Sequence, residues 1–102
     1  MFVARNIFGN KICARCGKGN VSLTKDHFIP KSCGMNVNGE GNYVAICRNC
    51  NQEKANKVVL PEWYEFLQAE QKEKLLRYMR YARSYVVKYV EDEEILKVVE
   101  RL

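Results

Sequence analysis

The sequence predicts an α+β protein, in which a small unit of two antiparallel strands and a helix precedes a group of C-terminal helices. Two Cys-x-x-Cys pairs bracket the first unit, and Gly, Asn and Pro divide it into short β-prone segments. Residues 62–90, in contrast, contain no Gly or Pro. We therefore expect a core at residues 1–60 and a helical extension at 61–102, packed together as one compact domain.

The two cysteine pairs, Cys13/Cys16 and Cys47/Cys50, have the spacing of a structural zinc site. Each short turn directs two sulfurs at one centre, and four thiolates at about 2.3 Å complete a tetrahedral zinc shell. Such a shell has no open position for water, so the zinc would be structural. A redox role would need only one pair, and the odd fifth cysteine, Cys33, disfavours a disulfide framework. Cys33 is expected to be a free loop cysteine.

The predicted elements of the core follow from local patterns. Residues 21–28 alternate enough for a strand, which Pro30 ends, and residues 43–46 predict an antiparallel partner. Residues 31–42 are rich in Gly and Asn and predict a loop. A helix is expected over about residues 48–58. The lead at residues 1–12 contains four apolar residues that we expect to pack on the domain: Phe2, Val3, Ile7 and Phe8.

Apolar residues recur at helical spacing after Pro61 and predict one long helix, or two in tandem, over residues 62–90. Asp92, Glu93 and Glu94 suit a new helix N-terminus, where negative charge meets the positive end of the helix dipole. Tyrosines and arginines alternate along residues 77–89. They would either line a nucleic-acid surface or pack on the core.

The formal net charge of +5 is concentrated in the cysteine-bearing part. Residues 1–60 contain nine Lys/Arg and three acids, whereas residues 61–102 contain eight and nine. A local positive field favours a polyanion such as nucleic acid. No run approaches the roughly 20 apolar residues of a membrane span, and no signal peptide is evident. We expect a cytoplasmic protein without membrane association; a phage or mobile-element origin is left open.

One ordered set of motifs has a familiar form, with cysteine pairs at both ends and Asp-His between them. Its pieces are Cys13-x-x-Cys16-Gly17, Leu23-Thr24-x-Asp26-His27-x-Ile29-Pro30-x-Ser32, Asn42 and Cys47-Arg48-x-Cys50-Asn51-x-x-Lys54. The set resembles the HNH nuclease family, the ββα-metal or His-Me finger nucleases, over about residues 13–57. The resemblance implies a ββα-metal core and metal-dependent cleavage of DNA, with double-stranded DNA as the expected partner.

The resemblance also implies individual roles. Asp26 matches the first metal-binding position, His27 the general base, Asn42 the residue that orients the base, and Asn51 the last metal-binding position. The four paired cysteines match the structural zinc ligands of one branch of the family. The last metal position is often histidine in the family, and here it is Asn51. The loop also departs from the usual pair of glycines, since Met35 follows Gly34.

The chemistry of phosphodiester hydrolysis agrees with these roles. A neutral imidazole is well suited to deprotonate water near pH 7, and His27 is the only histidine. Asp26 and Asn51 offer hard oxygen ligands, which favour Mg²⁺ or Mn²⁺. Adjacent strand residues point to opposite faces, so the strand must end or twist for Asp26 and His27 to share a site. The expected nucleic-acid contacts are Lys25, Lys31, Arg48, Lys54 and Lys57.

Two further interpretations stay open. A zinc-ribbon nucleic-acid-binding module without catalysis would share the zinc site and the basic surface, but it has no use for Asp26, His27 and Asn51 together. A purely structural protein built on the C-terminal helices explains only the second half of the chain. Whether RNA is also cut, and whether the chain forms a homo-oligomer, is not specified by the sequence.

Overall fold

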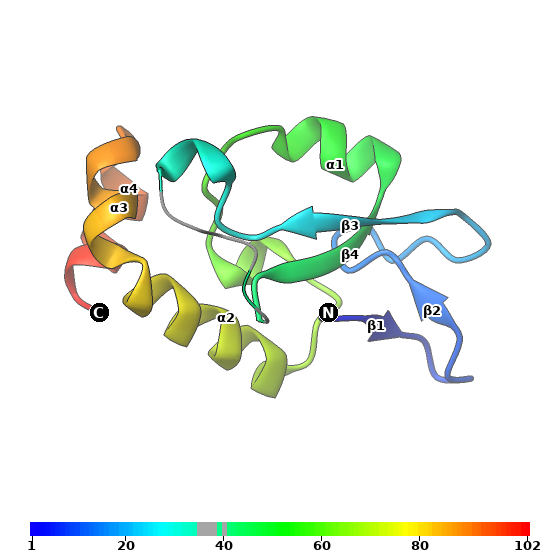
Figure 1. The fold of residues 1–102 in the computed structure, drawn as a ribbon. Helices are drawn as coiled ribbons and strands as arrows, with labels where there is room; N and C mark the ends of the chain where they lie inside the picture. The colour runs from blue at the N-terminus through cyan, green and yellow to red at the C-terminus, as the bar shows by residue number, and fades with distance from the viewer. Residues whose placement is uncertain (35–38, 40) are drawn as a thin grey trace.

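A computed structural model describes residues 1–34, 39 and 41–102. Within them the chain forms two antiparallel hairpins followed by four α-helices (Figure 1). The strands are β1 (Ala4–Arg5), β2 (Lys11–Ile12), β3 (Leu23–His27) and β4 (Tyr43–Cys47). The helices are α1 (Arg48–Lys54), α2 (Ala69–Tyr81), α3 (Arg83–Tyr89) and α4 (Glu93–Glu100). The predicted α+β class is confirmed, whereas residues 35–38 and 40 of the predicted loop lie outside the described residues.

The β3–β4 hairpin is the scaffold for the cysteine pairs and the Asp-His pair. Leu23 is paired with Cys47 at one end of the ladder, and His27 is paired with Tyr43 at the other. Helix α1 follows β4 without a connecting loop and packs against both strands. Both strands and the helix were predicted, but α1 ends at Lys54 and not near residue 58. The helix stops because Ala55 has a φ of 48° and a ψ of −128°, far from helical values.

Helices α2 and α3 are the two tandem helices that the sequence allows, and α4 is the separate helix predicted to begin near Asp92. Ala82, with a ψ of 3°, separates α2 from α3. Asp92 caps α4, because its Oδ1 accepts a hydrogen bond from the Glu94 amide at 3.0 Å. The prediction of helix from residue 62 is wrong: Pro61–Trp63 form a 3₁₀ turn, and α2 begins at Ala69. The intervening chain packs on the first cysteine turn, where the Phe66 amide donates to the Ala14 carbonyl at 3.0 Å.

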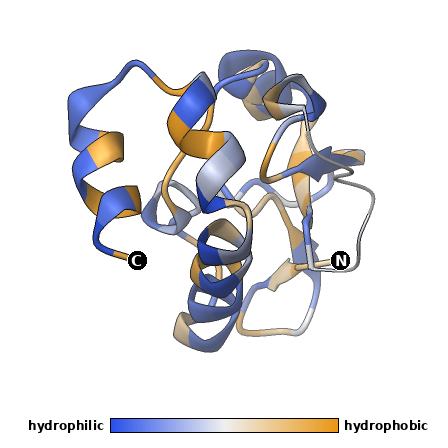
Figure 2. Cartoon of the chain, turned by 60° about the vertical axis from the view of Figure 1, so that its left-hand side comes forward, coloured by the Kyte–Doolittle hydropathy of each residue, from blue (hydrophilic) through white to orange (hydrophobic). Residues whose placement is uncertain are grey.

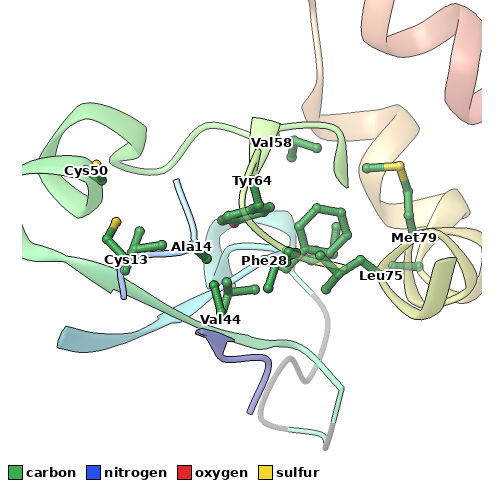
Figure 3. Close-up of a cluster of buried hydrophobic side chains, with 14 of the residues drawn as sticks. Cys13, Ala14, Phe28, Val44, Cys50, Val58, Tyr64, Leu75 and Met79 are labelled. Carbon is green, nitrogen blue, oxygen red and sulfur yellow. The ribbon is translucent and has the colours of Figure 1, made fainter. Parts of the chain in front are cut away.

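The hydrophobic core is shared by the hairpin and the C-terminal helices. Figure 3 shows Phe28 and Val44 of the hairpin segment together with Tyr64, and with Leu75 and Met79 of α2; all five are buried. The helices are amphipathic, with hydrophobic and hydrophilic stretches alternating along them (Figure 2). The division of the chain at residue 60 stays a prediction. None of the described helices is long and apolar enough to cross a membrane.

Two expectations about single residues need correction. Phe2 packs against the core beside β4, but Ile7 and Phe8 do not, because they lie at the exposed turn between β1 and β2. Cys33 is a free cysteine, as expected. It lies in a 3₁₀ turn at Lys31–Cys33 and is buried, and burial raises the pKa of its thiol.

Candidate functional site

The four paired cysteines converge on one point at one end of the β3–β4 hairpin. Their sulfurs all lie within 4.8 Å of one another, and the Sγ atoms of Cys16 and Cys47 are 3.8 Å apart. A tetrahedral site with zinc–sulfur bonds of about 2.3 Å has sulfur–sulfur edges of about 3.8 Å. The cluster therefore has the donor set and the spacing to hold a zinc ion.

Backbone amides prepare one of these sulfurs for a metal. The amides of Cys16 and Cys47 donate to Cys13 Sγ at 3.5 and 3.2 Å. Burial alone would raise the pKa of Cys13, but these donors outweigh it and lower the pKa to about 7. Burial and the neighbouring thiols raise the pKa of Cys50. Metal binding must therefore displace protons from the more basic thiols.

The Asp-His pair lies at the other end of the same hairpin. The ladder advances four residues from Cys47 to Tyr43, which corresponds to about 13 Å. At this end Asp26 and His27 line one cavity of about 160 Å³. The remaining walls come from the 3₁₀ turn and from the end of α1: Pro30, Lys31, Lys54, Ala55 and Asn56. Strand β3 ends at His27, as a shared site requires.

Lys54 is buried in this cavity wall and bridges α1 to the end of β3. Its side chain is 1% exposed, and Nζ lies 3.4 Å from Asp26 Oδ2 and donates to the His27 carbonyl at 2.8 Å. This burial argues against the predicted contact of Lys54 with phosphate. Its stem crosses the packed interface between α1 and β3, so the ammonium reaches Asp26 and not the surface. Burial lowers the pKa of Lys54, against the opposing effect of the Asp26 charge.

The Asp26 carboxylate is an incompletely satisfied buried group. Its side chain is 12% exposed, and no group within the described residues donates a hydrogen bond to Oδ2. The Lys54 ammonium lies 3.4 Å from Oδ2 and is an ion-pair partner only. Burial raises the pKa of Asp26, although the charge of Lys54 opposes this. Asp26 Oδ2 is therefore suited to bind a metal cation.

His27 lies across the ladder from Tyr43, with the ring centroids 4.8 Å apart. The Lys25 ammonium lies over the same Tyr43 ring, 3.9 Å from its centroid. Lys25 and His27 thus share one strand face, whereas Thr24 and Asp26 belong to the face that meets α1. The two faces come together only where β3 ends at the cavity.

The two predicted asparagines hold the segments on either side of the Asp-His pair. Asn42 is fully buried; its Oδ1 accepts from the Ile29 amide at 2.7 Å and its Nδ2 donates to the Ile29 carbonyl at 3.0 Å. It therefore fixes the chain two residues after His27. Asn51, in the first turn of α1, donates through Nδ2 to Thr24 Oγ1 at 3.0 Å. It does not line the cavity, but it lies against the same strand face as Asp26.

The family model of the HNH endonucleases matches residues 13–62. This stretch contains both cysteine pairs, the Asp-His pair and α1. Residues 13–62 belong to the HNH endonuclease family. Membership indicates a nuclease or another nucleic-acid-related function. Neither the curated proteins nor the solved structures contain a match to the chain.

Four of the five cations predicted to contact nucleic acid are exposed on the HNH segment: Lys25, Lys31, Arg48 and Lys57. Of these four, Lys31 lines the cavity that contains Asp26 and His27. Arg48 lines a separate hollow of about 220 Å³ together with Lys18, which sequence reasoning missed. The basic character of Lys18, two residues after the first cysteine turn, was the available signal.

Sequence reasoning also missed Ala55. This residue has a positive φ of 48° and lines the cavity directly after Lys54. Strained non-glycine backbone of this kind is concentrated at functional sites. Nothing in the identity of an alanine signals it.

Proposed function

We propose that the protein is a metal-dependent endonuclease that hydrolyses DNA phosphodiester bonds. The observation that carries this proposal is that Asp26 and His27 line one cavity at the junction of β3 and α1, within the HNH segment. A zinc-ribbon binding module needs the cysteine cluster but has no use for a buried carboxylate beside a histidine at the other end of the hairpin.

In the proposed reaction His27 accepts a proton from the attacking water. Its position at the end of β3 is fixed from two sides, because Lys54 holds its carbonyl and Asn42 holds the chain two residues later. Asn42 thereby serves the orienting role that the resemblance implies, through the backbone. General-base catalysis of this kind contributes a factor of roughly 100 to 10,000.

The residues around Asp26 fit a divalent cation. Among the described residues no group donates a hydrogen bond to the buried Asp26 Oδ2. The Asn51 amide donates through Nδ2 to Thr24, which leaves its oxygen to act as a ligand. Asp26 and Asn51 would hold Mg²⁺ or Mn²⁺, which prefer oxygen ligands. The ion would neutralise charge on the phosphate and on the leaving oxygen. Lys54 supplies positive charge beside Asp26 and keeps the carboxylate in place.

The cysteine cluster has a structural role in this proposal. One zinc bound by Cys13, Cys16, Cys47 and Cys50 would tie the first turn to β4 and α1. Structural zinc supplies on the order of 10 kcal/mol of apparent binding free energy to small domains. The five cysteines form no disulfide, which suits the reducing cytoplasm where we place the protein.

The proposed substrate is double-stranded DNA. Lys25, Lys31, Arg48 and Lys57 are the proposed phosphate contacts, and Lys31 is placed at the cavity. The test is cleavage of supercoiled plasmid by zinc-loaded protein, with Mg²⁺ or Mn²⁺ added or omitted and without chelator. Cutting that requires the added ion, and that Asp26→Asn abolishes, supports the proposal. Tight binding of plasmid without cutting under any of these conditions would favour the zinc-ribbon binding module.

A further inference from the structure

The tip of the β1–β2 hairpin, residues 6–10, presents two large apolar side chains to solvent. Ile7 is 93% exposed and Phe8 is 79% exposed. Single exposed apolar residues are ordinary on protein surfaces. Two adjacent exposed apolar side chains at the end of a projecting hairpin form a small apolar patch that can contact a partner.

Hydrogen bonds hold this tip in one conformation. Asn6 Oδ1 accepts from the amides of Phe8 and Asn10 at 2.9 and 3.1 Å. The Gly9 amide donates to the Asn6 carbonyl at 3.0 Å, and the Arg5 guanidinium donates to the Gly9 carbonyl at 2.8 Å. Gly9 has a φ of 81°, which glycine adopts without strain. A preorganised loop loses little conformational entropy when it binds a partner.

The charge around the tip selects a polyanionic partner. Residues 1–25 contain five Lys/Arg and no Asp or Glu. Arg5 and Lys11 flank the tip and are exposed. Gln71 of α2, which is neutral, donates through Nε2 to the carbonyl of Val3, just before β1, at 3.4 Å. A small apolar patch between two cations suits a ligand such as a nucleic acid, in which phosphates flank the apolar stacked bases.

The hairpin leads into the zinc end of the domain through β2, whereas the chain before β1 lies beside β4, where the Phe2 amide donates to the Tyr43 carbonyl at 2.8 Å. Strand β2 runs directly into Cys13, whereas the cavity lies at the other end of β3, about 13 Å along the ladder. Figure 1 shows the hairpin on the side of the molecule away from α3 and α4, with its tip directed outward. A duplex that reaches both the cavity and the tip must therefore span at least about four base pairs, at 3.4 Å each.

We infer that the β1–β2 hairpin is a second DNA-contacting element, which inserts Phe8 between base steps while Arg5 and Lys11 bind the adjacent phosphates. This inference rests on the proposed function and adds to it a contact several base pairs from the cut bond. Apolar wedges flanked by basic residues unstack a base step and kink the duplex. The hairpin thereby sets the position of the cavity on the duplex.

Binding is measured by fluorescence anisotropy with a labelled duplex, centred on a position mapped in the cleavage assay. All proteins carry His27→Ala so that the duplex stays intact. Phe8→Ser raises the Kd about tenfold or more, in line with one stacking contact. The double variant Arg5→Gln, Lys11→Gln lowers the salt slope by about 2, since two phosphate contacts are lost. The matched control is Tyr81→Ser, a 76% exposed aromatic on α2 that leaves the Kd unchanged.

A second readout reports the wedge itself. 2-Aminopurine is placed at successive positions of the duplex, and its fluorescence rises on unstacking at a site at least about four base pairs from the cut. The rise disappears in Phe8→Ser. Unchanged melting temperatures show that the variants are folded, as expected for substitutions at an exposed turn.

Several results would overturn the inference. Among them are equal Kd values for Phe8→Ser and its parent, or an equal loss in Tyr81→Ser. Phe8-dependent binding to phosphatidylserine vesicles with unchanged DNA affinity would assign the tip to a membrane surface. Phe8-dependent dimerisation without DNA would assign it to a second copy. If the unmodified chain cuts DNA and Phe8→Ser binds DNA with the same affinity as its parent, the hairpin role alone is overturned. If the chain neither binds nor cuts DNA, the proposed function is overturned as well.

Discussion

Replacing Lys54 by Met should destabilise the protein strongly, because it removes the cation from a buried ion pair. The Lys54 side chain is 1% exposed and that of Asp26 is 12% exposed, so the remaining carboxylate would lie in a largely dry site. Breaking such a pair costs about 3–5 kcal/mol, and the residual exposure of Asp26 favours the lower end. A loss of about 3 kcal/mol lowers the melting temperature of a domain of this size by about 12 °C or more.

The assay is thermal unfolding of zinc-loaded protein, followed by circular dichroism near pH 7. Lys57→Met is the matched control, since Lys57 is exposed and such a change stays within about 0.5 kcal/mol. Adding Asp26→Asn to Lys54→Met should restore part of the stability, because no unpaired charge then remains. The reasoning is refuted if Lys54→Met melts with the control, or if Asp26→Asn gives no rescue.

Three further predictions concern the zinc turn and the two metal sites. Gly17→Ala should lower the free energy of unfolding by about 1–2 kcal/mol, because a φ of 76° strains an alanine. The loss should exceed that of Gly9→Ala, because the new Cβ lies 2.5 Å from the Phe66 side chain at Gly17 and has nothing within 4 Å at Gly9; equal losses in urea unfolding would contradict this. Asn51→Ala should slow cleavage in a way that excess Mg²⁺ or Mn²⁺ partly restores, since a lost neutral ligand lowers metal occupancy; a metal dependence identical to that of the parent would exclude the ligand role. The apparent affinity for Co²⁺ as a zinc probe should rise from about pH 6 to pH 8, because protons compete with metal and the Cys13 pKa of about 7 lies in that window; absorbance titrations that are flat with pH would contradict it.

The predictable parts of this protein are those determined by local spacing. The Cys-x-x-Cys turns, the alternation that ends at His27 and the acidic start of α4 all depend on neighbours within a few residues. The segment between Pro61 and Ala69 was mispredicted for the same reason. It lacks helix breakers after Pro61, but contact of Phe66 with the first cysteine turn fixes it in a non-helical form.

The role of Lys54 could not be read from the sequence, because its ion pair depends on how α1 lies against β3. On an isolated helix, Lys54 would be another exposed cation like Lys57. The exposure of Ile7 and Phe8 was hidden in a similar way. Their apolar character predicts burial, whereas the turn that Asn6 and Gly9 close places them at the tip of a hairpin. Tertiary geometry decided both cases.

The central claim, that His27 activates water at a metal site, is tested most directly by His27→Ala in the plasmid assay. Cleavage with saturating Mg²⁺ or Mn²⁺ should fall by a factor of roughly 100 to 10,000, and more metal should not restore it, because the missing step is deprotonation. Zinc content, melting temperature and DNA affinity should match those of the parent. If His27→Ala cuts as fast as the unmodified chain, the catalytic base is elsewhere and the proposed site is wrong.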